Sequence, residues 1–258
     1  MKIGLRLYLR RTLTLAEFEI RKLIHDQTQV WIRIIQPALW LLVFGEAFTK
    51  LRAIPTGNYT YLQFMTPGVL AQSVMFVAIF YGITVVWERD LGLLNKLLST
   101  PTPRSAIVMG KALSAGLRGV VQAAAVFILA LIIRVQISLN PLHLLGVLLI
   151  VILLGMLFAS LSMCLAALVR TRERVMGIGQ AITMPLFFAS NAIYPTSILP
   201  AWLKALVTIN PLSYVIDAMR GLLITNDLSK LTLDMTVIIL STAFIVWLAS
   251  WSFKRILY

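Results

Sequence analysis

The stretch from Pro141 to Val169 contains 29 residues and no Asp, Glu, Lys or Arg. As an α-helix, which rises ~1.5 Å per residue, it exceeds the ~30 Å hydrocarbon core of a bilayer, so it must tilt or protrude. In addition, 59% of the chain is hydrophobic, and several other apolar stretches reach spanning length. The sequence therefore predicts an all-α integral membrane protein with a single transmembrane domain over residues 1–258.

Six stretches are long and apolar enough to be transmembrane helices. The predicted spans are residues 30–48, 64–87, 106–133, 141–169, 175–192 and 233–251. Residues 3–24 precede them and are amphipathic, with Leu5 and Leu9 on one helical stripe and Arg6 and Arg10 on another. This pattern predicts an interfacial helix whose basic face meets lipid headgroups, and an ordinary cytosolic segment is the alternative.

The distribution of Lys and Arg predicts the orientation in the membrane. With the N-terminus inside, 17 of the 23 Lys and Arg residues fall on the cytosolic side. The six on the outer side are Lys50, Arg52, Arg134, Lys204, Arg220 and Lys230. The positive-inside rule thus places both termini in the cytosol. The net charge of +13 is explained by residues that flank spans and meet anionic lipids, so no nucleic-acid partner is expected.

Residues 193–232, between the fifth and sixth spans, are apolar for a connection outside the membrane. Three prolines, Pro195, Pro200 and Pro211, divide them into helical stretches too short to cross a bilayer. Short apolar helices broken by proline are typical of a re-entrant hairpin or of helices in the outer leaflet. A plain extracellular loop is the alternative, but it would expose Trp202 and its apolar neighbours to water.

Motifs for catalysis within this chain are absent from the sequence. There is no GxxxxGK[ST] phosphate-binding loop and no HExxH motif, and His25 and His143 fall on opposite sides of the membrane. The single Cys164 cannot form a disulfide within the chain. Charged residues are spread through the first 22 positions, so we expect no cleavable signal peptide. The chain is expected to hold no cofactor or metal and to be no enzyme itself.

Few polar residues fall inside the predicted spans. Glu46, near the outer end of the first span, is the one acidic residue well inside a span; it can pair with Lys50 or Arg52, face a lumen or relay protons. Gln72, Gln122, Gln180 and Asn191 are uncharged candidates for a transport path, although such residues more often link helices. Ala115, Gly119, Ala123, Gly155 and Ala159 follow four-residue spacing, which favours close helix contacts within the bundle or across a dimer.

The polar connection 88–104 joins the second and third spans on the side where basic residues accumulate. Leu91, Leu94 and Leu98 recur at helical spacing, which predicts a short amphipathic helix at the membrane surface. The chain therefore combines a transporter-like body with no visible source of energy. We interpret this connection as a docking element for a partner that supplies the energy.

Three stretches contain recognisable motifs. They are QPALWLLVFGEAF (36–48) with YLQFMTPGVLAQSVMF (61–76), ERDLGLLNKLLSTPTPRSAIVMGKAL (88–113), and FFASNAIYPTSILPAWLKALVTINPLSYVIDAMRG (187–221). Together they resemble the ABC-2-type permeases, the membrane subunits of ATP-binding-cassette exporters, and among these the drug-resistance and nodulation branch. One departure is Asp90-Leu91, where many members have Gly-Thr.

The resemblance implies a half-transporter built from two six-span permeases, either identical or sister copies, and two separate ATPase subunits that hold ATP and Mg²⁺. Substrates would be amphipathic drugs, lipids or lipid-linked glycans moved outward across the plasma (inner) membrane of a prokaryote. The predicted ATPase-coupling residues are Glu88, Arg89, Asp90, Leu94, Lys96 and Leu97. The predicted outer hairpin or gate residues are Pro195, Pro200, Trp202, Asn210, Pro211 and Tyr214. The alternatives are an ATPase-independent secondary carrier or channel, and a membrane assembly scaffold.

Overall fold

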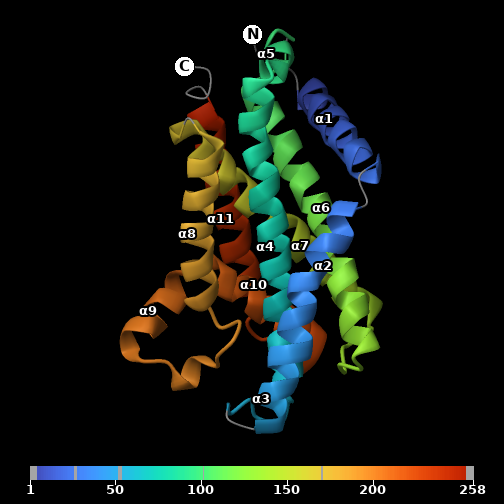
Figure 1. The fold of residues 1–258 in the computed structure, drawn as a ribbon, viewed down its shortest axis with the longest axis vertical. Helices are drawn as coiled ribbons and strands as arrows, with labels where there is room; N and C mark the ends of the chain where they lie inside the picture. The colour runs from blue at the N-terminus through green and yellow to red at the C-terminus, as the bar shows by residue number, and fades with distance from the viewer. Residues whose placement is uncertain (1–4, 26–27, 52–53, 101, 170, 254–258) are drawn as a thin grey trace.

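The computed structural model of the chain describes residues 5–25, 28–51, 54–100, 102–169 and 171–253. These residues form a helical bundle without strands, as the sequence predicts (Figure 1). The α-helices are α1 (Leu5–His25), α2 (Thr28–Leu39), α3 (Glu46–Leu51), α4 (Tyr61–Asp90), α5 (Leu93–Leu98), α6 (Arg104–Ile132), α7 (Pro141–Leu168), α8 (Arg172–Phe188), α9 (Ala201–Ile209), α10 (Pro211–Arg220) and α11 (Leu231–Ser252). Two π-helical segments, Trp40–Gly45 and Gly221–Thr225, and a 3₁₀ turn, Thr196–Ile198, complete them.

Five segments of the described chain are long and apolar enough to cross a membrane. They are Ile32–Leu51, Tyr61–Asp90, Arg104–Ile132, Pro141–Leu168 and Leu231–Ser252. The predicted fifth span, 175–192, corresponds to α8, a helix of 17 residues whose first turn is charged and which ends at Phe188. This helix runs beside α4 in the bundle (Figure 1). The protein is thus a multi-pass membrane protein, and the predicted span at α8, which would bring the number to six, stays a prediction.

Helix α4 is the centre of the bundle. It is buried along most of its length and packs against α6, α7, α8 and α10. Thr60 and Gln63 form a capping box that satisfies backbone amides at its start. The helix ends before Gly92, whose positive φ of 70° suits a residue without a side chain. Its 30 residues extend ~45 Å, so its last turns reach beyond a ~30 Å hydrocarbon core.

Small residues bring the long helices close together. A Cβ at Gly82 of α4 would lie 2.5 Å from the Cβ of Ser162 on α7. Likewise, a Cβ at Gly155 of α7 would lie 2.6 Å from the Cα of Gly116 on α6. Of the two uses that the small-residue spacing allows, Gly155 therefore serves a contact within the bundle.

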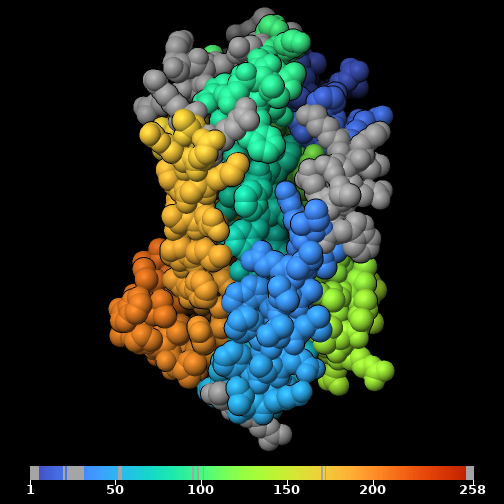
Figure 2. All heavy atoms as spheres, in the orientation of Figure 1, coloured from blue at the N-terminus to red at the C-terminus, as the bar shows by residue number. Residues whose placement is uncertain are grey.

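The two ends of the bundle hold different short helices (Figure 1). We call the end with α1 and α5 the α5 end, and the opposite end, with α3 and α9, the α9 end. The last turn of α11 also lies at the α5 end. The terminal residues 1–4 and 254–258, and with them the predicted positions of both termini, lie outside the described residues. On the face shown in Figure 2, α2 and α3 cover α4 toward the α9 end, and α8 forms one edge.

The α-helical hydrogen bonding of the first span is interrupted, and a side chain of α6 supplies one of the lost hydrogen bonds. Pro37 has no amide hydrogen for the carbonyl of Arg33 one turn earlier, and the π-helical segment Trp40–Gly45 follows it. The side-chain amide of Gln122 on α6 donates a hydrogen bond of 3.3 Å to that Arg33 carbonyl. A carbonyl without a partner would be costly inside a membrane, so this contact ties α2 to α6.

Candidate functional site

A buried ion pair network lies at the α5 end, where three helices meet. The Nζ atom of Lys111 on α6 lies 2.7 Å from a carboxylate oxygen of Glu88 on α4 and 3.1 Å from one of Glu19 on α1. The side chains of Lys111, Glu88 and Glu19 are only 3%, 11% and 6% exposed. One ammonium group therefore joins two carboxylates that are far apart in the sequence.

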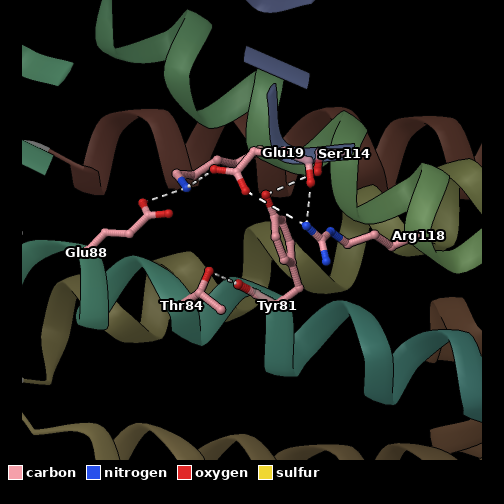
Figure 3. Close-up of polar contacts among 7 residues, drawn as sticks. Glu19, Tyr81, Thr84, Glu88, Ser114 and Arg118 are labelled. Atoms are coloured by element: carbon pink, nitrogen blue, oxygen red, sulfur yellow. Dashed lines mark hydrogen bonds and ion pairs between the residues drawn. The ribbon is translucent and has the colours of Figure 1, made fainter. Parts of the chain in front are cut away.

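Arg118 extends the network along α6. Its guanidinium donates a hydrogen bond to the backbone carbonyl of Glu19 and lies 3.9 Å from the carboxylate of the same residue. It also lies over the ring of Tyr81, 4.5 Å from the ring centroid, and the Tyr81 hydroxyl accepts a hydrogen bond of 3.1 Å from Ser114. We call Glu19, Tyr81, Glu88, Lys111, Ser114 and Arg118 the ion cluster (Figure 3).

Helical spacing explains how the ion cluster forms. Tyr81 and Glu88 are seven residues apart on α4, and Lys111 and Arg118 are seven apart on α6, so each pair shares one helix face. Helix α1 comes close because Gly110 has no side chain: a Cβ there would lie 2.9 Å from a side-chain Cβ of α1. The formal charges of the two acids and two bases cancel, which favours burial of the whole group.

Some of the predicted coupling residues are buried in the bundle, and others are partly or fully exposed. Glu88 faces the ion cluster, and Leu94 of α5 is fully buried in an apolar group that includes residues of α4, α6, α7 and α11. Leu97 is partly buried against the same group. Arg89 and Asp90 pair with each other at 3.2 Å, and Lys96 is exposed. Helix α5 is therefore attached by Leu94, while Leu93 and Lys96 are exposed.

The predicted gate residue Asn210 links α8 to α10. Its side-chain oxygen accepts a hydrogen bond of 3.0 Å from the Leu212 amide, which caps α10, and Pro211 takes the first helical position, where no amide hydrogen is needed. Its side-chain NH₂ group donates to the carbonyls of Leu186 and Ala189 at 2.7 and 2.8 Å. These contacts satisfy carbonyls at the end of α8 that lack helical partners.

The other hairpin residues shape α9. Pro195 precedes the 3₁₀ turn and Pro200 caps the start of α9, both in extended backbone geometry. The Tyr214 hydroxyl donates to the Thr208 carbonyl at 2.7 Å and so holds α9 against α10. Trp202, in contrast, is 67% exposed, like most of α9. Helix α10 is buried against α4, α7 and α11, and α9 lies outside them (Figure 1).

Asp217 and Arg220, near the end of the third motif stretch, form a second ion pair, in which Arg220 is largely buried and the Asp217 side chain is 43% exposed. The Arg220 guanidinium lies 3.0 Å from the Asp217 carboxylate, donates to the Asn191 carbonyl at 2.8 Å and lies 4.0 Å from the centroid of the Phe64 ring. Burial raises the pKa of Asp217 and lowers that of Arg220 to about 10, and their mutual attraction opposes both shifts. This pair fixes the end of α10 to the start of α4.

The predicted path residues do not meet in one place. Glu46 is exposed and pairs with Lys50 at 3.4 Å, one of the arrangements that the sequence allows. Gln72 is buried beside a small cavity between α2 and α4, and Gln122 bonds to α2 as described. Gln180 is exposed on α8, and Asn191 is buried at the α9 end. In this chain they therefore occupy separate environments.

Sequence reasoning missed most of the ion cluster, because neither Glu19 nor Tyr81 was a candidate. A usable signal was Arg118, which lies well inside an apolar stretch and therefore needs a partner. Lys111, seven residues before it, lies on the same helix face. Among the described residues, no group of three His, Cys, Asp or Glu side chains is placed to hold a metal ion.

Comparison with protein families decides the identity. Residues 10–224, from α1 to the π-helical segment after α10, match the model of ABC-2 type transporters. The chain belongs to the ABC-2 type transporter family. The resemblance seen in the three motif stretches is therefore confirmed. An ABC-2 permease is a membrane transport subunit that is not itself catalytic, and permeases of this family pair with ABC ATPases.

Relatives of this ABC-2 permease come from bacteria and algal plastids. It is 29% identical over 194 residues to the transport permease ycf38 of Cyanophora paradoxa, covering 73% of this chain and 66% of that protein, just under two thirds. It is 28% identical over 199 residues to the daunorubicin resistance ABC transporter permease protein DrrB1 of Streptomyces coeruleorubidus, covering 77% and 70%. The inner membrane transport permease YadH of Escherichia coli is 24% identical over 246 residues, covering 90% and 91%.

Proposed function

We propose that this ABC-2 permease moves an amphipathic substrate outward, driven by ATP hydrolysis on a separate ATPase subunit that binds at the α5 end. ATP and Mg²⁺ belong to that subunit. The observation that supports this most is the ion cluster, which joins α1, α4 and α6 directly beside α5. The α5 end is then cytosolic, and the membrane is a plasma or inner membrane like that named for YadH.

The ion cluster gives a route for force from the ATPase to the membrane helices. The exposed side of α5, including Lys96, and the exposed basic residues of α1, including Arg10, are the surfaces that a partner would contact. Separating Lys111 from either carboxylate would break a buried ion pair at a high cost in free energy. We therefore expect α1, α4 and α6 to move together. Helices α4 and α6 extend to the α9 end, where that movement would open or close the outer hairpin.

Several features support an amphipathic substrate. The cavity between α2 and α4 combines polar Arg33, Gln36 and Gln72 with aromatic Phe76 and Phe80, and its volume of about 80 Å³ would admit only part of a drug-sized molecule. The side-chain NH₂ of Gln72 has no hydrogen-bond partner among the described residues. The daunorubicin resistance named for DrrB1 favours a drug-like or lipid substrate of this kind. We propose that two copies, identical or sister chains, enclose the path, that α8 also crosses the membrane as the fifth of six spans, and that residues 193–232 form a re-entrant hairpin.

The docking surface can be tested by charge reversal. Lys96→Glu changes an exposed residue of α5, and Lys204→Glu makes the same change on exposed α9 at the other end of the bundle. We expect Lys96→Glu to reduce co-purification of the ATPase and substrate-stimulated hydrolysis in vesicles, while Lys204→Glu leaves co-purification unchanged. Equal co-purification in the two variants would place the ATPase elsewhere, and full transport by the chain alone would favour a secondary carrier.

A further inference from the structure

A polar cavity of about 290 Å³ lies at the α9 end, between the start of α4, the end of α10 and the start of α11. Its lining includes three acids, Asp217, Asp227 and Asp234, and two bases, Arg220 and Lys230. The acids therefore exceed the bases by one formal charge. This volume is near the lower limit of small-molecule sites and suits a headgroup rather than an acyl chain.

Two buried side chains in the cavity wall have acceptor atoms without a partner. Asp234 is only 4% exposed, and its carboxylate forms no hydrogen bond or ion pair with any residue that the structure describes. Asn191 is 3% exposed, and its side-chain oxygen likewise has no hydrogen-bond partner in the described chain. The Asn191 oxygen is fully enclosed, whereas the Asp234 oxygens are not, so the carboxylate is accessible from the cavity, where a donor group would satisfy it.

The bases of the cavity do not supply that donor. Arg220 is engaged by the Asp217 carboxylate at 3.0 Å and by the Asn191 carbonyl at 2.8 Å. Lys230, one helical turn before Asp234, is exposed and approaches that carboxylate only as a nearby charge. A compact cation with several N–H donors would match these acceptors, and a primary ammonium group meets that description.

We propose that this cavity binds the primary ammonium of an aminophospholipid headgroup, with Asp234 as its counter-ion and Asn191 as a second acceptor. Asp234 lies in the first turn of the candidate span α11, so the cavity lies at the depth of lipid headgroups. A trimethylammonium headgroup has no N–H to donate and is bound more weakly. This inference does not depend on coupling to an ATPase.

Lipid binding to the purified full chain in detergent tests the proposal. Native mass spectrometry would compare dioleoyl phosphatidylethanolamine with dioleoyl phosphatidylcholine for the unmodified chain, Asp234→Asn and Asp227→Asn. Asp227 is fully exposed on the cavity rim, so its variant removes the same charge without touching the buried acceptors. We expect Asp234→Asn to weaken phosphatidylethanolamine binding about tenfold, as for loss of one charge-assisted hydrogen bond, and Asp227→Asn to weaken it much less, because its charge is screened by solvent.

Equal binding of the two lipids, or equal binding of phosphatidylethanolamine by both variants, overturns the proposal. Displacement by free ethanolamine at the same concentration would support the ammonium chemistry and overturn the lipid as its source. If Asp234→Asn does not fold, carbodiimide labelling of Asp234 in the unmodified chain replaces it. Phosphatidylethanolamine should then protect Asp234 and phosphatidylcholine should not, whereas equal labelling refutes the site.

Discussion

Replacement of Lys111 by Met tests whether the ion cluster holds α1 to the membrane helices. The variant keeps a long side chain in a site that is 3% exposed but removes the charge that joins Glu19 and Glu88. Both carboxylates then remain buried, and Arg118 still lies 3.9 Å from that of Glu19. We expect the free energy of unfolding to fall strongly and α1 to separate from α6.

The distances set the size of this effect. Coulomb's law at an effective dielectric constant near 20 gives about 5 to 6 kcal/mol of attraction for each of the 2.7 and 3.1 Å contacts. Desolvation offsets most of that, and removal of one partner from a buried pair costs about 3–5 kcal/mol. Because Lys111 serves two carboxylates, we expect a loss near the upper value. Adding Glu88→Gln to this variant removes the negative charge that Lys111 compensated. The double variant should regain about 1–3 kcal/mol of unfolding free energy.

Denaturation by sodium dodecyl sulfate in mixed micelles measures this loss, and proteolysis after α1 reports its release. Arg89→Met is the matched control, because Arg89 pairs with Asp90 near the surface, with side chains 22% and 38% exposed. We expect its loss to cost less than that of Lys111, because this pair is more exposed to solvent. If Lys111→Met destabilises the protein no more than Arg89→Met, or if Glu88→Gln recovers nothing, the ion cluster does not hold these helices together.

Three further variants test the helix packing, the outer hairpin and the role of Glu46. Gly155→Ala should cost about 1–3 kcal/mol of unfolding free energy, because its Cβ would collide with the backbone of α6, whereas Gly177→Ala, with open space around it, should cost nothing. Asn210→Ala should lower the thermal midpoint more than Asn140→Ala, because Asn210 binds α8 as well as capping its helix, while Asn140 only caps α7. Glu46→Gln should change stability by less than about 0.5 kcal/mol and leave transport intact, and a loss of transport would restore Glu46 as a proton relay.

Hydropathy predicted the long helices well, because spans of this length have few other stable structures. The predicted hairpin prolines likewise match the starts of α9 and α10, since Pro200 and Pro211 cannot lie within a helix interior without cost. Local geometry was harder to predict. Leu91 fits the leucine stripe of the polar connection, but Gly92 ends the helix and leaves Leu91 70% exposed outside α5.

The ion cluster could not be predicted because its partners are remote in sequence. Glu19 and Lys111 are 92 residues apart, and each has an ordinary alternative near a membrane surface, where lipid headgroups and water satisfy charges. Arg118 was the exception, since an arginine deep in an apolar stretch requires a partner. Which acid it meets depends on how α1 docks, and Gly110, which permits that docking, resembles any other small residue in a span.

The bond from Gln122 to the Arg33 carbonyl has a consequence for how the first span can move. If α2 separates from α6, that carbonyl loses its donor inside the membrane, at a cost of about 1–3 kcal/mol. A cost of this size favours contact between the two helices and is small enough for a conformational change to overcome. Water that enters between α2 and α6 would donate to the Arg33 carbonyl in place of Gln122. Hydration of this contact would therefore lower the free-energy cost of separating the two helices.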